Sequence, residues 1–216
     1  MKSLRSLLGF SLLSLPLFGA GGDVRVEITD DKGTPVADAV ASLRPLDTPP
    51  AIQPPTEPVL VVQQDQEFLP YVTAVVVGTQ ISFPNRDRVQ HHVYSLSAAK
   101  PFELPLYRDE PHQPVRFDRP GVVALGCNIH DWMAAYIVVL PTPFFATTPA
   151  NGIAPLAALP PGRYQLEVWH PRIAAVVTRE VTVDPNDQRT QVITVKLKPD
   201  RRIRRAPEMG GSGAYR

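Results

Sequence analysis

Three side chains that can bind a metal follow one another at steps of three residues: Cys127, His130 and Met133. Cys127 is the only cysteine in the sequence. Thiolate and thioether sulfur favour Cu(I), imidazole binds copper in either oxidation state, and a weak axial thioether tunes the reduction potential. A thiolate, an imidazole and a thioether on one short loop therefore indicate a copper site suited to electron transfer.

A copper site of this type needs a second histidine from another part of the fold. The adjacent residues His91 and His92 follow an apolar alternating run and can supply it. Neighbouring residues of a regular strand point to opposite faces, so the two imidazoles cannot easily face one metal together. The residues alone leave the choice between His91 and His92 open.

The elements that must position these side chains are predicted to be strands. The 216 residues include 25 prolines, which disfavours a helical bundle. Apolar and polar residues alternate, as in Val24-Arg25-Val26-Glu27-Ile28. Residues 46–58 and 142–150 are predicted to be connectors. Short strands between Gly/Pro turns are typical of an all-β sandwich. The predicted strands cover residues 24–28, 36–43, 59–62, 72–77, 81–83, 91–96, 115–117, 121–125, 135–140, 164–169, 176–183 and 190–197.

Charge and cysteine content exclude some classes of protein. The formal net charge is +1, whereas a protein that binds nucleic acid normally has a strong basic excess. With one cysteine, the chain cannot form an intramolecular disulfide. No nucleophile–base pair or carboxylate pair stands out in the sequence, so we do not expect an enzyme.

The first 22 residues predict an export signal. Lys2 and Arg5 precede a short apolar run at residues 7–18, and small residues follow at 19–22. The apolar run is too short to span a membrane. We therefore expect a periplasmic protein without a transmembrane segment after cleavage. A free thiol is exposed to oxidation in that compartment, and a bound metal would protect Cys127; a buried, inert cysteine is the alternative.

The segment from residue 66 to about residue 140 resembles the cupredoxins, the plastocyanin-like and amicyanin-like blue-copper proteins. The resemblance implies a Greek-key β-sandwich with one type 1 copper held by His91, Cys127, His130 and Met133. More narrowly, the whole chain is similar to bacterial periplasmic proteins often labelled methylamine utilization proteins. The motifs behind the resemblance are Gln66-x-Phe68-x-Pro70, Phe83-x-Asn85-x-Asp87, His91-His92-Val93-Tyr94-Ser95 and Cys127-x-x-His130-x-x-Met133.

The resemblance also assigns roles to the two adjacent histidines. Cupredoxins usually carry His-Asn at this point, and the asparagine joins the two ligand loops by hydrogen bonds. Alignment to that pattern makes His91 the ligand and places His92 where the asparagine would be, as a hydrogen-bonding neighbour or an additional ligand. Asn128 is a further candidate for a hydrogen bond across the loop.

The segments on either side resemble carboxypeptidase-regulatory-like (transthyretin-like) β-sandwich modules. Asp31-Lys32-Gly33-x-Pro35-Val36 matches the opening of such a module, and Pro160-Pro161-Gly162-x-Tyr164 matches a later hairpin. The cupredoxin would then be merged with, or inserted in, a second small β-sandwich. The predicted divisions are a signal at 1–22, module parts at 23–45 and 142–199, a copper-binding domain at 46–141, and a disordered basic tail at 200–216.

These features lead to three hypotheses for the function. The first is a periplasmic copper protein that carries single electrons between redox partners, such as a cytochrome or a dehydrogenase. The second is a copper-binding module for delivery or sequestration, and the third is a non-metal adhesion or assembly module.

Overall fold

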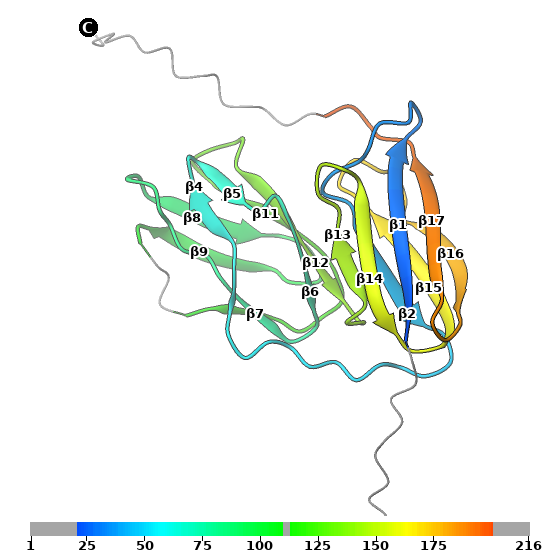
Figure 1. The fold of residues 1–216 in the computed structure, drawn as a ribbon. Coiled ribbons are helices and arrows are strands. Elements are labelled where there is room, and N and C mark those ends of the chain that lie inside the picture. Colours follow the sequence, from blue (N-terminus) through cyan, green and yellow to red (C-terminus); the bar gives the residue numbers. More distant parts are fainter. Residues whose placement is uncertain (1–20, 110–112, 201–216) are drawn as a thin grey trace, which may run out of the picture.

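The computed structural model describes residues 21–109 and 113–200, which form strands and loops (Figure 1). Within these ranges, no helix has the length and apolar character needed to cross a membrane. The strands are β1 Gly22–Asp30, β2 Val40–Pro45, β3 Val59–Leu60, β4 Val62–Gln64, β5 Glu67–Leu69, β6 Val72–Val76, β7 Thr79–Ser82, β8 His91–Ser95, β9 Phe102–Tyr107, β10 Val115–Phe117, β11 Gly121–Gly126, β12 Ala134–Leu140, β13 Phe145–Thr147, β14 Ile153–Leu159, β15 Gly162–Trp169, β16 Val177–Val183 and β17 Gln188–Val195.

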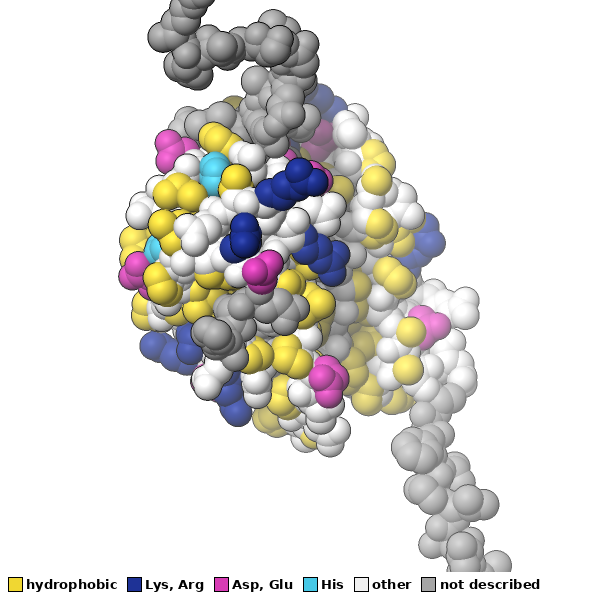
Figure 2. All heavy atoms as spheres, turned by 90° about the vertical axis from the view of Figure 1, so that its left-hand side faces the viewer, with side chains coloured by type: hydrophobic (Ala, Val, Ile, Leu, Met, Phe, Trp, Pro, Cys, Tyr) yellow, Lys and Arg dark blue, Asp and Glu magenta, His cyan; other side chains and the backbone are white. Residues whose placement is uncertain are grey.

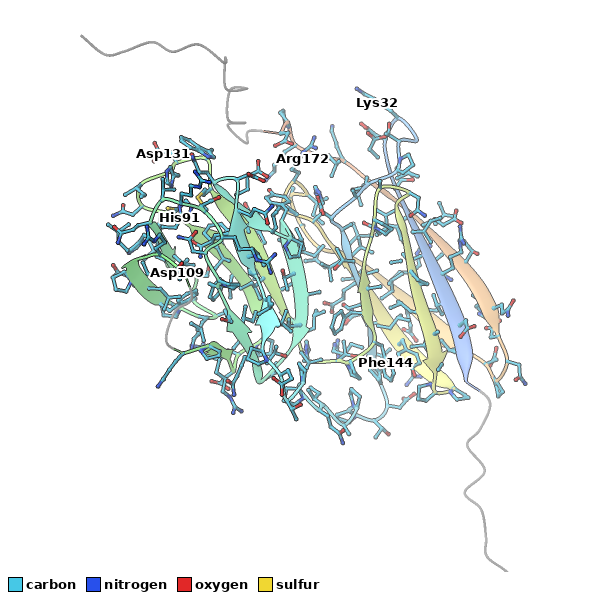
Figure 3. The ribbon with its side chains drawn as sticks, turned by 60° about the vertical axis from the view of Figure 1, so that its left-hand side comes forward. Lys32, His91, Asp109, Asp131, Phe144 and Arg172 are labelled. Carbon is cyan, nitrogen blue, oxygen red and sulfur yellow. The ribbon has the colours of Figure 1, made fainter. Side chains whose placement is uncertain are left out.

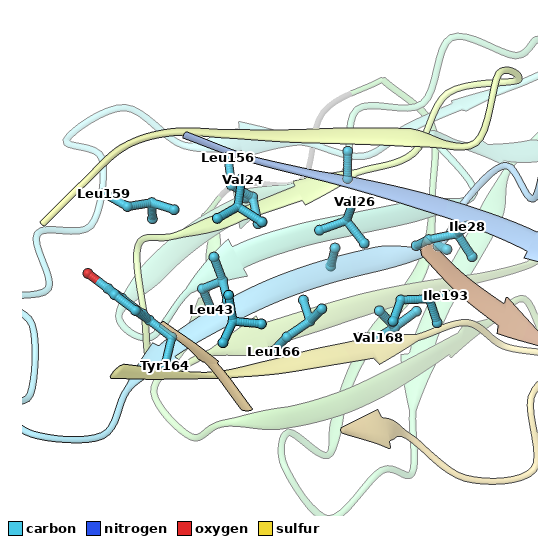
Figure 4. Packing of buried hydrophobic residues seen from close by; sticks show 14 of the residues in the cluster. Val24, Val26, Ile28, Leu43, Leu156, Leu159, Tyr164, Leu166, Val168 and Ile193 are labelled. Carbon is cyan, nitrogen blue, oxygen red and sulfur yellow. The ribbon is translucent and has the colours of Figure 1, made fainter. Parts of the chain in front are cut away.

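Strands from both ends of the described chain build one sandwich, here called the flanking sandwich. Its two sheets have the strand orders β14-β1-β17 and β13-β2-β15-β16. In β1, Val24, Val26 and Ile28 are buried, whereas Arg25 and Glu27 alternate with them and face outward. The buried residues meet those of β15, including Leu166, in a single apolar core (Figure 4). Burial of this alternating face is the main force that stabilises the sandwich.

Residues between β2 and β13 build the second sandwich, here called the central sandwich. Its sheets have the orders β6-β12-β11-β8-β9 and β10-β7-β3, and the β4–β5 hairpin stands beside them. Phe68, Phe83 and Phe117 lie fully buried in its core together with Cys127 and Met133. The metal-binding candidates therefore sit at the edge of a rigid apolar core.

The two sandwiches pack against each other through the outer face of β12 and β6. Ile137 of β12 points into the central core, while Val138 and Leu140 contact Val40 of β2. The ring of Tyr136 lies 5.6 Å from that of Trp169, on β15 of the flanking sandwich. Because β12 is covered on both faces, its sequence is a nearly continuous apolar run.

The prediction of an all-β sandwich architecture is confirmed. Several strand assignments were wrong: residues 142–150 are not only a connector, since they contain β13, and β5, β9 and β14 were not predicted. Residues 36–39 form a bend, so that β2 begins at Val40. Residues 46–58 contain no strand. The predicted domain boundaries stay predictions. Most of the predicted signal segment (1–20) and of the predicted tail (201–216) lies outside the described residues.

Candidate metal centre

The candidate ligands lie at one end of the central sandwich, on two segments that the sheet brings together. His91 is the first residue of β8, and Cys127 directly follows β11. The strands β8 and β11 are neighbours, with Gly126 opposite Tyr94. A Cβ atom at Gly126 would meet the Tyr94 ring at 2.9 Å, so glycine permits this close approach. Pairing of the two strands thus places His91 beside the loop that begins at Cys127.

The loop from Cys127 to Met133 joins β11 to β12 and is closed by a turn. The backbone N–H of Met133 donates to the carbonyl of His130 at 2.9 Å. This turn returns the chain to the sheet within a few residues of Cys127, so that His130 faces the cysteine. Figure 3 shows His91 and Asp131, a residue of this loop, at the same end of the central sandwich.

Three donor atoms converge in a small triangle. The Nδ1 atoms of His91 and His130 are 3.1 Å apart. The Sγ atom of Cys127 lies 3.6 Å from Nδ1 of His130 and 4.0 Å from Nδ1 of His91. A point equidistant from all three lies about 2.1 Å from each, close to the lengths of metal–imidazole and metal–thiolate bonds. Both the size of the triangle and its N₂S composition therefore fit one copper ion.

This triangle is the one group of three or more His, Cys, Asp or Glu residues in the described ranges with metal-binding spacing. His91 and Cys127 are buried, with 0% and 5% of their surface exposed, whereas His130 is half-buried. His130 is consequently the part of the site nearest to solvent, whereas the core encloses His91 and Cys127.

The orientation of His91 is fixed by a carboxylate. Its Nε2 atom lies 2.7 Å from Oδ2 of Asp87. An ionised carboxylate only accepts hydrogen bonds, so the imidazole proton is on Nε2 and Nδ1 keeps a lone pair. That lone pair faces Cys127 and His130. A carboxylate behind a metal-binding histidine is a common arrangement that fixes the tautomer and raises the basicity of the ligand.

Asp87 is itself held by the turn of the β4–β5 hairpin. Its oxygens accept the backbone N–H groups of Asp65 at 2.7 Å and Gln66 at 2.9 Å. Burial alone would raise the pKa of Asp87, but the hydrogen bonds from Gln66, His91 and Asp65 outweigh it, so the pKa lies below its ordinary value. From the sequence, Asp87 was named only as part of the motif Phe83-x-Asn85-x-Asp87 and was given no role in the site. A carboxylate four residues before a candidate histidine was the available signal.

His92 lies on the other side of β8. Its Nε2 atom contacts Oε1 of Glu103 at 2.8 Å, on the neighbouring strand β9. The structure therefore brings His91, and not His92, together with Cys127 and His130. Asn128 is exposed on the loop, and a bracing role for it stays a prediction.

Met133 is buried in the same core cluster as Cys127, with 2% of its surface exposed. This position is compatible with an axial thioether, and that role stays a prediction. Trp132 precedes Met133 in the chain and packs against His130, with 5.2 Å between the centres of the two rings. The indole Nε1–H of Trp132 donates to the carbonyl of Gln66 at 3.1 Å.

No family model matches the chain, and no curated protein does. Many solved structures match part of it, among them the following three. A copper-containing nitrite reductase from Thermus scotoductus is 25% identical over 45% of this chain (TM-score 0.37), and this chain spans a quarter of its length. A purple cupredoxin from Nitrosopumilus maritimus is 20% identical over 38% of this chain and 99% of its own (TM-score 0.34). Amicyanin from Paracoccus versutus is 16% identical over 40% of this chain and 84% of its own (TM-score 0.34).

These likenesses are partial, and the assignment of the site depends on the geometry of its own residues. The central sandwich carries one candidate histidine at the start of β8 and the other candidate ligands around the β11–β12 loop, as the sequence resemblance to cupredoxins predicts. The narrower resemblance to methylamine utilization proteins, and that of the flanking sandwich to transthyretin-like modules, stay predictions.

Proposed function

We propose that this protein is a mononuclear type 1 copper protein that carries single electrons between periplasmic redox partners, without catalysing a reaction of its own. The observation that supports the proposal is the triangle of His91 Nδ1, His130 Nδ1 and Cys127 Sγ, whose size fits one metal ion. Two imidazoles and one thiolate, with a weak thioether, are the donors of blue-copper electron-transfer sites. When bound, copper supplies a one-electron couple.

Each ligand has a distinct task in this proposal. Cys127 binds as the thiolate and is shielded from solvent by the core. His91 is enclosed and tied to Asp87, so its Nδ1 atom keeps its position whichever oxidation state is present. His130 lies nearest to solvent and is the ligand through which an electron would enter or leave.

The surface beside His130 is suited to brief contacts with a partner. Ile129 is 49% exposed and Trp132 is half-buried, so both add apolar surface near His130. Figure 2 shows this side of the central sandwich, where hydrophobic side chains lie between charged ones. Small interfaces are typical of redox partners that must dissociate quickly. A cytochrome or a dehydrogenase is the partner that we propose, and the predicted export signal would bring the protein to it.

A test uses the chain without its first 22 residues, loaded with one equivalent of Cu(II). An electron carrier shows a reversible one-electron wave in voltammetry, keeps its metal on reduction, and exchanges electrons rapidly with a c-type cytochrome. Release of Cu(I) to a competing chelator on reduction would contradict the proposal and support delivery or sequestration. Absence of Cu(II) binding would contradict both and leave a β-sandwich adhesion or assembly module.

A further inference from the structure

We propose that Asp87 and the turn at Asp65 and Gln66 position both histidines of the site, so that one hairpin sets the copper affinity and the reduction potential. The inference rests on the proposed copper site and adds residues that lie outside its ligand set. It is built from three contacts that join segments far apart in the sequence.

The first contact is between Asp87 and His91. The two side chains meet at 2.7 Å, with 13% of the Asp87 side chain and none of the His91 side chain exposed. Because the His91 ring is fully buried, the Asp87 carboxylate is the partner of its Nε2–H. This contact holds the ring with Nδ1 toward Cys127.

The second contact holds Asp87 to the β4–β5 hairpin. Asp65 and Gln66 form its two-residue turn and have φ angles of 57° and 58°, in the left-handed region that non-glycine residues rarely adopt. In this conformation both backbone N–H groups point to the same carboxylate. A two-residue hairpin turn of this type requires positive φ at both central residues, so the hairpin itself sets the direction of these two N–H groups.

The third contact leads from the same turn to the other histidine. The carbonyl of Gln66 accepts the indole N–H of Trp132, and the indole ring packs against His130. Gln66 therefore donates to the group behind His91 and accepts from the residue beside His130. A continuous set of contacts thus joins the two ligands, which are 39 residues apart in the sequence.

The chemical consequence follows from the charge on Asp87. A carboxylate that accepts the Nε2–H of an imidazole increases the electron density at Nδ1 and strengthens the bond to a metal. Cu(II) gains more from a stronger donor than Cu(I) does, so Asp87 is expected to lower the reduction potential. Loss of the charge should raise the potential, and loss of the hydrogen bond should also release the ring.

Three variants separate these effects. Asp87→Asn keeps an acceptor oxygen but removes the charge, and Asp87→Ala removes both. Asp65→Asn is the matched control, because it removes a charge from the same turn while its backbone N–H still donates to residue 87. The side chain of Asp65 is exposed and accepts a hydrogen bond from Gln64 at 3.5 Å.

The first measurement needs no copper. In ¹⁵N NMR spectra of the metal-free protein, His91 is expected as a single Nε2–H tautomer in the wild type and in Asp65→Asn, and as a tautomer mixture in Asp87→Ala. The second measurement is Cu(II) affinity by chelator competition. Asp87→Ala should lose about 10–100-fold, the usual effect of a partner behind a metal-binding histidine. Asp87→Asn should have a higher reduction potential than Asp65→Asn.

The outcomes of these measurements distinguish the two proposals. A wild-type His91 protonated on Nδ1, or a tautomer unchanged in Asp87→Ala, would overturn the positioning role. Affinities and potentials equal in the Asp87 variants and in Asp65→Asn would overturn it too. A wild-type protein that holds the Nε2–H tautomer but binds no Cu(II) would refute the proposed function and still support the contact of Asp87 with His91. Trp132→Phe keeps an aromatic ring but loses the N–H, and it tests the third contact. An unchanged Cu(II) affinity would mean that Trp132 does not help to position His130.

Discussion

Replacing His91 by alanine is expected to weaken Cu(II) binding by at least about 100-fold, while His92→Ala weakens it by less than about tenfold. Structural metal sites with four ligands bind with about 10–16 kcal/mol, so one strong ligand contributes on the order of 3–4 kcal/mol, or about 10²–10³-fold. His91 is such a ligand by position, since its Nδ1 atom is 3.1 Å from that of His130. His92 instead contacts Glu103, whose side chain is 70% exposed, and pairs of that kind contribute little.

The two histidines are a matched pair, because they are adjacent in β8 and differ mainly in the face that they occupy. In the metal-free protein, His91→Ala leaves a void and removes one partner of Asp87, which should cost about 2–4 kcal/mol of stability. His92 is also buried and packs against the ring of Tyr94, so His92→Ala should cost a similar amount, and the two variants should differ in copper affinity more than in stability. Urea unfolding measures both values. In the loaded protein, added imidazole should enter the void of His91→Ala and restore much of the visible absorption.

Two results would refute this account. If His92→Ala lost the visible absorption and His91→Ala kept it, His92 would face the metal and His91 would lie on the opposite face of β8. Equal affinities in the two variants would mean that His91 is not the preferred ligand of the pair.

Three further predictions concern other parts of the molecule. Met133→Leu should raise the reduction potential, because loss of a donor disfavours Cu(II); an unchanged potential in voltammetry would make Met133 a packing residue only. Trp169→Ala should lower the free energy of unfolding by about 1–3 kcal/mol, since it removes a half-buried ring from the contact with Tyr136; a change under about 0.5 kcal/mol would argue against a stable contact between the sandwiches. The pKa of Asp30 lies below its ordinary value because the N–H of Thr34, and then that of Lys32, donate to it. Its contribution to stability is therefore present above the unfolded pKa of about 3.9 and is lost as pH falls through the folded pKa. Wild type and Asp30→Asn should then differ in stability near neutral pH and converge in acid, and a constant difference would refute this.

The strands that the sequence analysis missed share a physical reason. Strands β5, β9, β13 and β14 each lie at an edge of a sheet and pair with one neighbour only. An edge strand is covered on fewer sides and tolerates proline, as at Pro105 and Pro155. Their apolar patterns are accordingly weak, whereas β1 and β15 in sheet interiors alternate clearly and could be predicted.

The candidate site was predictable where the donors themselves carry the signal. Cys127, His130 and Met133 follow one another on a short loop, and strand alternation limited the other ligand to His91 or His92. The position of Asp87 four residues before His91 was a signal for the contact between them, but the backbone amides that hold Asp87 come from a hairpin more than twenty residues earlier. Pairings over such distances arise from the tertiary fold and leave no local pattern.

The account depends most on copper bound by the thiolate of Cys127. The direct measurement is the visible absorption spectrum of the metal-free protein titrated with Cu(II), in the wild type and in Cys127→Ser. We expect an intense blue band that saturates at one equivalent in the wild type and is absent from the variant, because the thiolate supplies the charge-transfer transition. The far-ultraviolet circular dichroism should be the same in both, since the β-sandwich is stabilised by its apolar cores. A wild type without the band, or a band that persists in Cys127→Ser, would contradict the copper assignment.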